Sequence, residues 1–276
     1  MVDGANVRFA KYLEGKTLFS KFKIASAVVV TAGLLTIGGI ANGAGASWSY
    51  TGPTGPSHWA TIDPTNYALC ADGSAQSPIN ITKTKSVDLT NLLFKYTAGE
   101  AGIFNNGHTV EAEPLGTEAS TMTLGGVVYP FVQFHFHAPS EHEINGMHYP
   151  VEVHFVHKTA DGKIAVVGVF LKAGDKANAA WAPFVDKMTA ATADPEATKA
   201  EIDWATLLPS NKQTVRYDGS LTTPGCSEGV KWNVFTHPVV VSQAQINTFL
   251  ESYSGNNRPV QPLHNRVVTF DSTATK

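Results

Sequence analysis

Cysteine is scarce in this chain, at only 2 of 276 residues. Two distant thiols cannot build a zinc knuckle or a disulfide-dense small domain, so any metal site must rest on the 10 histidines. Charge is also sparse, with 20 Lys and Arg against 23 Asp and Glu and a formal net charge of −3. The chain has no basic run beyond its N-terminus and so lacks the positive surface that nucleic-acid binding needs. We expect no nucleic-acid partner.

The N-terminal segment has the organisation of a secretory signal peptide. Residues 1–23 are a basic n-region, and residues 24–40 are an h-region without a charged residue. The sequence Ala44-Gly45-Ala46 then offers small residues to a signal peptidase. We therefore predict a signal peptide over residues 1–46 with cleavage near 46/47, and a periplasmic or secreted mature protein without membrane contact. The alternative is an uncleaved anchor, because the apolar run lies at the lower edge of the roughly 17–25 residues that span a bilayer.

Residues 47–276 contain no second long apolar run, no repeat and no separating linker, which predicts one domain. Short segments rich in Val, Phe and Thr predict strands over 121–136, 149–158, 164–172, 230–241 and 264–270. Helical spacing predicts helices over 176–191 and 243–253, the second opened by a capping box from Ser242 to Gln245. The apolar stripe of the first helix is expected in the core and comprises Trp181, Phe184, Val185 and Met188. The fold class is therefore mixed and dominated by β-structure.

Histidines are concentrated in the string Gln133-Phe-His-Phe-His137. If this string is a strand, side chains alternate, so Gln133, His135 and His137 share one face. In the segment that follows, the same alternation places Glu152 and His154 on one face.

His157 falls on the opposite face of that second segment. Three neutral histidines from neighbouring strands, with a fourth position open, are typical of catalytic zinc. A metal-bound histidine usually donates its other ring N–H to a fixed acceptor. Gln133 and Glu152, each two residues before a candidate ligand, are placed to orient His135 and His154.

A cupin-type metal barrel is the competing interpretation. Its pattern also starts with two histidines and a glutamate, and here His135, His137, Glu141 and His154 mimic it. Glu141 would then be a ligand, and the mixed donor set would favour iron or manganese. The Pro-x-Gly turn before the last cupin histidine is missing, because Pro150 is followed by Val and Glu.

Ordered motifs are distributed over the whole predicted domain. They are Trp48-Ser-Tyr50, Gly55-Pro-Ser-His-Trp59, Gln76-Ser-Pro-Ile-Asn-Ile81, Asn105-Asn-Gly-His108, the Gln133–His137 string, Ser140-Glu-His142, Glu152-Val-His154, Gly168-Val-Phe-Leu-Lys172 and Ser220-Leu-Thr-Thr-Pro224. Together they resemble the motifs of the α-class carbonic anhydrases.

The resemblance implies a single domain with a large twisted, mostly antiparallel sheet of about ten strands and short peripheral helices. It implies a lyase that hydrates CO₂ to bicarbonate and a proton by attack of zinc-bound hydroxide. One Zn²⁺ per chain would be held by His135, His137 and His154. A non-catalytic zinc-binding module, the other alternative, is expected to lack at least one of these ligands. The oligomeric state, monomer or homodimer, stays open.

The same resemblance implies roles for residues around the metal. Thr222 would accept a hydrogen bond from the nucleophile and donate its own to Glu141, which can only accept when ionised. Thr223 would line the bicarbonate side. The apolar wall that holds CO₂ would comprise Val156, Val166, Leu221, Val230 and Trp232.

His108 matches the family's proton shuttle, and an imidazole with a pKa near 6.5 suits proton transfer near neutral pH. Tyr50 and Asn106 match the polar positions that order the water between shuttle and metal. Glu111 departs from the amide that many members carry, and a carboxylate there affects the water chain or the pKa of His108.

The two cysteines are expected to pair. Because the chain is predicted to be exported, Cys70 and Cys226 form a disulfide in an oxidising compartment. Cys226 lies four residues after Thr222, so the bridge would anchor the catalytic loop to the N-terminal part of the domain. Gly225 stands where relatives often have proline, which makes this anchor more important.

Overall fold

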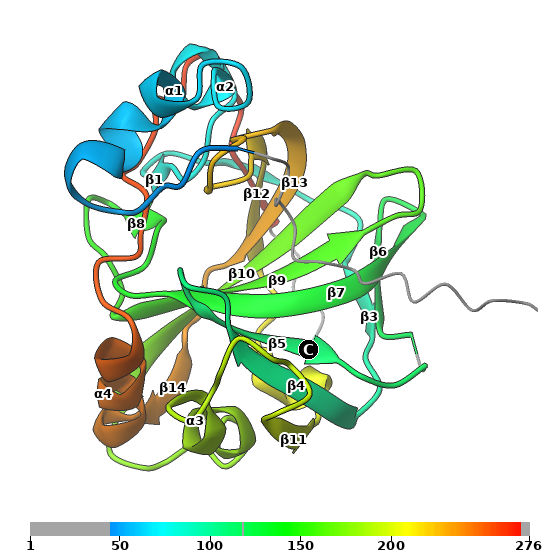
Figure 1. Cartoon of the computed structure of the whole chain (residues 1–276). Helices are drawn as coiled ribbons and strands as arrows, with labels where there is room; N and C mark the ends of the chain where they lie inside the picture. The colour runs from blue at the N-terminus through cyan, green and yellow to red at the C-terminus, as the bar shows by residue number, and fades with distance from the viewer. Residues whose placement is uncertain (1–44, 118, 272–276) are drawn as a thin grey trace, which may run out of the picture. The chain divides into compact units, whose positions relative to one another are not determined.

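A 13-stranded sheet dominates the computed structural model (Figure 1), which describes residues 45–117 and 119–271. Ten strands follow one path across it in the order β11-β4-β5-β7-β9-β10-β13-β12-β15-β2. Strands β14, β6 and β3 extend the sheet off this path, and β1 and β8 form a separate pair. Most of the predicted signal peptide, residues 1–44, lies outside the described residues.

The strands before the first large helix are β1 (Asn80–Ile81), β2 (Lys85–Val87), β3 (Leu93–Lys95), β4 (Gly99–Asn105), β5 (Val110–Pro114), β6 (Thr121–Leu124), β7 (Val127–His137), β8 (Glu143–Ile144), β9 (Val151–Lys158) and β10 (Ile164–Gly174). Those after it are β11 (Lys199–Ile202), β12 (Thr214–Ser220), β13 (Glu228–Phe235), β14 (Val239–Ser242) and β15 (Thr269–Asp271). Most neighbours in the large sheet are antiparallel, and β10 pairs in parallel with both β13 and β14. The predicted β-dominated fold is therefore confirmed.

Two of the predicted strands are interrupted in the structure. The segment 121–136 is a hairpin of β6 and β7, because Gly125 and Gly126 both take positive φ, at 56° and 81°, as a tight two-residue turn requires. The segment 230–241 divides into β13 and β14 on either side of Pro238, which has no N–H for a sheet. Strands β13 and β14 both pair with β10, so the chain stays beside the same strand on either side of the interruption.

The other boundaries shift by smaller amounts. The segments 149–158 and 164–172 correspond to β9 and β10. The segment 264–270 is strand only over β15, because a turn that includes His264, at φ 51°, precedes it.

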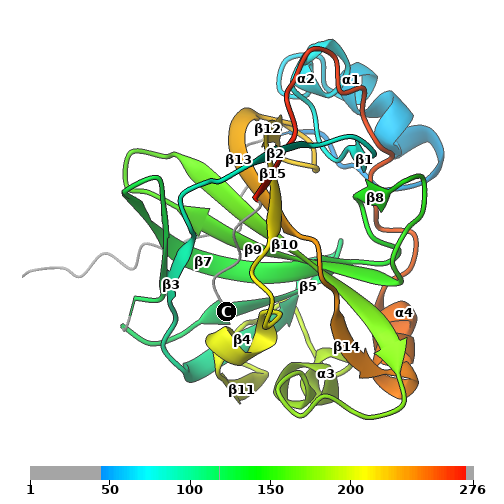
Figure 2. The ribbon, with the colours of Figure 1, turned by 180° about the vertical axis from the view of Figure 1, so that it is seen from behind.

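Short helices lie at the two ends of the sheet in both ribbon views (Figures 1 and 2). They are η1 (Gly52–Thr54), η2 (Pro56–His58), α1 (Trp59–Ile62), α2 (Leu69–Asp72), α3 (Ala182–Met188), η3 (Trp204–Leu207) and α4 (Gln243–Ser252). The predicted helix 176–191 is shortened to α3, which begins with Pro183 in its first turn, where a missing N–H costs nothing. The capping box of α4 is present, with Ser242 and Gln245 bonded reciprocally.

The apolar core fills the space between the sheet and the helices α3 and α4. The stripe from Trp181 to Met188 is buried, as expected. Phe134 packs edge-on against Phe184, and Phe136 packs edge-on against Phe249 of α4. One face of β7 is thereby committed to the core, which leaves its other face for Gln133, His135 and His137.

Cys70 of α2 and Cys226 form a disulfide that joins positions 156 residues apart. It closes the loop that contains Thr222 against the N-terminal part of the domain. In this loop Gly225 and Cys226 both have positive φ, at 91° and 46°. The expected bridge is thus confirmed.

Replacement of both cysteines by serine is expected to lower the free energy of unfolding by about 2–5 kcal/mol, because a bridge across so long a loop restricts the unfolded chain. Urea unfolding of the double variant measures the loss, and mass spectrometry of the native protein should detect no free thiol. An unchanged unfolding midpoint would contradict the expectation.

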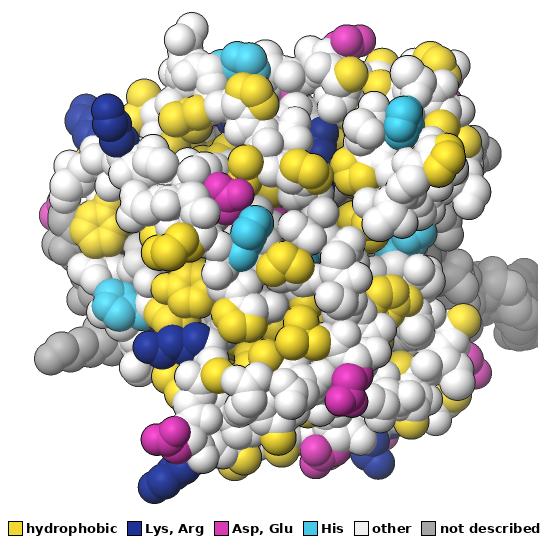
Figure 3. All heavy atoms as spheres, turned by 90° about the vertical axis from the view of Figure 1, so that its left-hand side faces the viewer, with side chains coloured by type: hydrophobic (Ala, Val, Ile, Leu, Met, Phe, Trp, Pro, Cys, Tyr) yellow, Lys and Arg dark blue, Asp and Glu magenta, His cyan; other side chains and the backbone are white. Residues whose placement is uncertain are grey.

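Charged side chains are few on the face shown in Figure 3, where hydrophobic side chains are more numerous. Within residues 45–117 and 119–271, no helix has both the length and the apolar character that a membrane crossing requires.

Candidate active site

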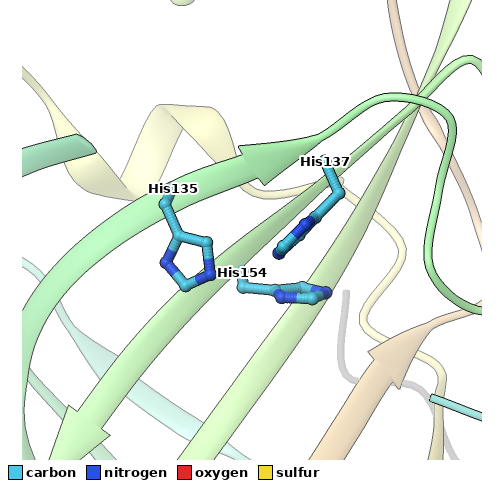
Figure 4. Close-up of side chains that lie close together, drawn as sticks. All are labelled: His135, His137 and His154. Carbon is cyan, nitrogen blue, oxygen red and sulfur yellow. The ribbon is translucent and has the colours of Figure 1, made fainter. Parts of the chain in front are cut away.

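Three histidines converge from two neighbouring strands (Figure 4). His135 and His154 are direct cross-strand partners on β7 and β9, and His137 lies two residues further along the same face of β7. The ring centroids are 5.4 Å apart for His135 and His154 and 4.6 Å apart for His137 and His154. One ring nitrogen from each residue lies within 4.8 Å of the others, which is a spacing that can hold a metal ion.

Each of these histidines has one ring nitrogen bound to an acceptor. His135 Nδ1 lies 2.9 Å from Gln133 Oε1, and His137 Nδ1 lies 2.7 Å from the backbone oxygen of Asn256. His154 Nε2 lies 3.0 Å from Glu152 Oε1. These contacts set the tautomers, because a nitrogen that donates its proton leaves the opposite nitrogen with a free lone pair.

The cluster is largely buried, since His137 and His154 are buried and His135 is half-buried. His137 Nε2 has no hydrogen-bond partner among the described residues, which is unusual for a buried polar atom. Burial lowers the pKa of His137 to about 4, and burial also lowers the pKa of His135 and of His154. All three rings are therefore neutral near pH 7, as metal ligands must be.

Glu152 serves more than one histidine. Its Oε1 lies 2.7 Å from His142 Nδ1 as well as 3.0 Å from His154, and its Oε2 accepts from the His142 N–H at 2.8 Å. Burial opposes its ionisation, but the charges and hydrogen bonds of the two histidines outweigh this effect and hold the pKa of Glu152 well below its usual value. A Cβ at position 168 would lie 2.9 Å from Glu152 Oε1, so any residue larger than glycine at this position would press on the carboxylate.

Glu141 is fully buried beside the cluster. Its Oε1 accepts from the Arg258 N–H at 2.8 Å, while its Oε2 lies 3.5 Å from His137 Nε2 and has no hydrogen-bond partner in the described part of the chain. Burial raises the pKa of Glu141 to about 7, although the Thr222 hydroxyl and two other contacts act in the opposite direction. Thr222 is itself buried, in the loop that follows β12, and Thr223 beside it is half-buried.

An apolar wall adjoins His154. Val156, two residues along β9, pairs with Val166 of β10, which in turn pairs with Trp232 of β13. The Trp232 ring lies 4.8 Å from the His154 ring, and its Nε1–H donates to Ser220 O at 2.9 Å. Val230 shares the face of Trp232 and is buried, whereas Leu221 is half-buried on the adjoining loop.

His108 lies on the loop between β4 and β5. Its ring stacks on Trp48 with centroids 3.7 Å apart and planes 5° apart, and Tyr50 packs edge-on against both rings. Burial lowers the pKa of His108. Asn106 is exposed, and its Oδ1 accepts from the N–H groups of His108 and Thr109, both at 2.9 Å, which shapes the turn.

Glu111 connects this loop to a candidate ligand. It accepts from Asn106 Nδ2 at 2.7 Å and from Gln133 Nε2 at 3.4 Å, and Gln133 in turn holds His135. Burial raises the pKa of Glu111 to about 7, although the Asn106 hydrogen bond acts against this shift. The carboxylate is thus part of a hydrogen-bonded chain between the loop and β7.

Glu111→Gln is expected to stabilise the protein at pH 8 and to have little effect at pH 4. Because the pKa of Glu111 is higher in the folded protein than its ordinary value of 4.5, stability falls as the pH rises from 4.5 to about 7. At 1.36 kcal/mol per pKa unit, the loss is at most about 3 kcal/mol, and a neutral amide avoids it.

Urea unfolding at pH 4, 6 and 8 measures this difference, with Glu251→Gln on the exposed side of α4 as the control. A stability difference that is the same at all three pH values would contradict the assignment to Glu111.

Several residues around the site were not predicted from the sequence. Asn256 and Arg258 contribute backbone groups to His137 and Glu141, and backbone groups leave no pattern in side-chain identity. His142, whose Nε2 lies 2.6 Å from Tyr217 Oη, was visible only as part of the Ser140-Glu-His142 motif.

The chain is similar to known carbonic anhydrases over most of its length. The sequence profile described as eukaryotic-type carbonic anhydrase matches residues 54–272. The carbonic anhydrase of Klebsiella pneumoniae is 43% identical over 227 residues, covering 80% of this chain and 89% of the relative. That of Neisseria gonorrhoeae is 40% identical over 230 residues, covering 83% and 89%.

A solved structure agrees with these relatives. The α-carbonic anhydrase from Thermovibrio ammonificans, in complex with the inhibitor sulfanilamide, has a TM-score of 0.75 and 42% identity, covering 82% of this chain and 99% of that chain. A match of this extent overturns the cupin alternative. The chain belongs to the eukaryotic-type, or α-class, carbonic anhydrase family, and it is a lyase that catalyses the reversible hydration of CO₂ to bicarbonate.

Proposed function

We propose that the chain hydrates CO₂ at a zinc ion held by His135, His137 and His154. The observation that carries this proposal is that one nitrogen of each ring is bound to an acceptor, and that each ring also brings one nitrogen to within 4.8 Å of the other two rings. An all-imidazole set of three ligands favours zinc, and it leaves room for water. Zinc in such sites lowers the pKa of bound water to about 7, a value that belongs to carbonic anhydrases in general.

Thr222 and Glu141 would aim the nucleophile. The positive charge of a metal ion held by the three neutral histidines would favour ionised Glu141, because opposite charges stabilise one another across a short buried distance. An ionised carboxylate only accepts hydrogen bonds, so the Thr222 hydroxyl must donate to it. The Thr222 oxygen is then left to accept a hydrogen bond from the nucleophile, and this directs the attacking lone pair toward CO₂.

The substrate would lie against the apolar wall beside His154. CO₂ has no net charge and gains little from hydrogen bonds, so a wall without strong donors can place its carbon near the nucleophile without binding it tightly. The paired side chains of Val156, Val166 and Trp232 form this wall, with Leu221 and Val230 at its edge. Thr223 would face the bicarbonate that forms.

His108 would accept the proton that each turnover releases. Free hydroxide near pH 7 is ~10⁻⁷ M and, at a collision limit of ~10⁹ M⁻¹s⁻¹, removes a proton only ~10² times per second. Carbonic anhydrases reach turnover on the order of 10⁶ s⁻¹, so a local acceptor is needed. Because burial lowers its pKa, His108 is neutral near pH 7 and ready to accept. Tyr50 and Asn106 would order the water between His108 and the metal.

The protein would act outside the cytoplasm. Signal-peptide features over residues 1–46 support export, and the Cys70–Cys226 disulfide supports an oxidising compartment such as the periplasm. Its partners would be the small molecules CO₂ and bicarbonate, and the choice between monomer and homodimer is left to solution measurements.

Removal of the metal tests the central assignment. CO₂ hydration, followed by stopped flow, is expected to fall to the uncatalysed rate after treatment with a chelator and to return when one equivalent of zinc is added. Retention of the full rate in protein that atomic emission shows to be free of metal would contradict the proposal.

A further inference from the structure

The loop that carries His108 is fastened to a segment far away in the sequence. Tyr253, just after α4, donates its hydroxyl proton to Asn105 Oδ1 at 2.5 Å. Asn256 Nδ2 donates to the backbone oxygen of His108 at 3.2 Å. These contacts hold Asn105 and His108, which lie on the two sides of a turn. The two residues between them, Asn106 and Gly107, are exposed.

The same Asn256 side chain is bound to the strand of the candidate ligands. Its Oδ1 accepts from the Ala138 N–H at 2.8 Å, and its Nδ2 donates to Phe136 O at 3.0 Å. These two backbone groups flank His137, whose ring binds the backbone oxygen of Asn256 itself. Asn256 is 2% exposed, so its amide is committed to these partners.

Sheet topology explains why a side chain is needed here. Strand β5 pairs with β7 only at Glu111 with His135 and at Ala112 with Phe134. Beyond His135, β7 has no further partner in β5, because the chain of β5 has turned into the His108 loop. The amide of Asn256 and the hydroxyl of Thr109, which donates to Phe136 O at 2.6 Å, occupy the place of the missing strand.

We propose that Tyr253 and Asn256 are positioning residues for proton transfer, because they fix the backbone of the His108 loop against the strand that carries His137. This inference rests on the proposed shuttle role of His108. Proton transfer through ordered water requires a fixed separation between donor and acceptor. A loop released on one side moves His108 relative to the metal, and the water between them loses its order. The conversion of CO₂ itself needs no such loop.

Tyr253→Phe isolates the effect, because it removes one hydroxyl and leaves a ring that packs edge-on against Phe136. In dilute buffer we expect kcat to fall about 3- to 10-fold, the effect of one hydrogen bond, while kcat/KM stays within about 2-fold of its starting value. Imidazole at tens of millimolar should restore kcat by accepting the proton directly. Tyr96→Phe is the matched control, since its hydroxyl lies 2.7 Å from His157, on the opposite face of β9, and its kcat should be unchanged.

The His108→Ala variant and the double variant Tyr253→Phe/His108→Ala complete a cycle. Tyr253 and Asn256 together form a clamp on the His108 loop. If this clamp acts through His108, the double variant loses no more kcat than His108→Ala alone. An unchanged kcat in His108→Ala overturns the shuttle role and the clamp with it. A fall in His108→Ala with an unchanged Tyr253→Phe overturns the clamp alone. Additive losses of kcat in the double variant also overturn the clamp. So does a joint fall of kcat, kcat/KM and Tm in Tyr253→Phe with a kcat that imidazole does not restore, because the Tyr253 hydroxyl would then have only a structural role.

Discussion

Replacement of His154 by alanine is expected to remove the metal and reduce CO₂ hydration to the uncatalysed rate. The change deletes one of three ligands and leaves Glu152, whose Oε1 lies 3.0 Å from His154 Nε2, with one partner fewer. Loss of an outer partner of a metal ligand already costs about 10- to 100-fold in metal affinity, so loss of the ligand itself should exceed 100-fold. His135→Ala and His137→Ala are expected to behave in the same way.

Metal content by atomic emission and CO₂ hydration by stopped flow measure the two effects. His157→Ala provides a matched control on the same strand, because His157 is equally buried but faces Tyr96 on the other side of β9. We expect this control to lose stability and to keep its metal. A His154→Ala variant with full activity and no metal would refute the proposed mechanism.

Thr222→Ala is expected to lower kcat/KM by about 10²- to 10³-fold with the metal retained. Removal of one preorganised hydrogen bond that acts on the reacting atoms costs an enzyme about 2.7–4 kcal/mol. Glu141→Ala should produce a loss of similar size, because it removes the acceptor that sets the direction of the Thr222 hydroxyl. Neither residue creates the nucleophile, so neither change should release the metal.

Thr222→Ser is the matched control, since it keeps the hydroxyl, and its kcat/KM should lie much closer to that of the unaltered protein. Loss of metal in Glu141→Ala would contradict the role given to Glu141, whose Oε2 lies 3.5 Å from His137 Nε2. Equal losses in Thr222→Ala and Thr222→Ser would show that the loop, and not the hydroxyl, was disturbed.

The histidine cluster followed from the sequence because alternation along a strand is a local property. Two residues per repeat place Gln133, His135 and His137 on one face of any strand, whatever surrounds it. The structure agrees, with Gln133 bound to His135 and with His135 directly opposite His154. The capping box of α4 was predictable for the same reason, since it depends on residues three apart. The disulfide was predictable for a different reason, because the chain is expected to be exported and has only two thiols to pair.

Strand boundaries were less well predicted, because the apolar pattern continues across a tight turn. Gly125 and Gly126 interrupt the segment 121–136, and Pro238 interrupts 230–241, although a strand lies on both sides of each interruption. Local composition indicates that a segment favours a strand. Whether a turn interrupts that strand depends on the backbone dihedrals and on which strand the chain pairs with after the turn.

The sequence by itself determined which side chains are the candidates for the chemistry, because ligand type, strand alternation and family motifs all depend on residue identity. Only the tertiary structure decided what holds them. The carbonyl of Asn256 on His137, the N–H of Arg258 on Glu141 and the space that Gly168 leaves for Glu152 join segments more than ten residues apart. The first two are backbone groups, which every residue possesses, and the third is an absent side chain. Such contacts exist only once the sheet has brought distant strands together.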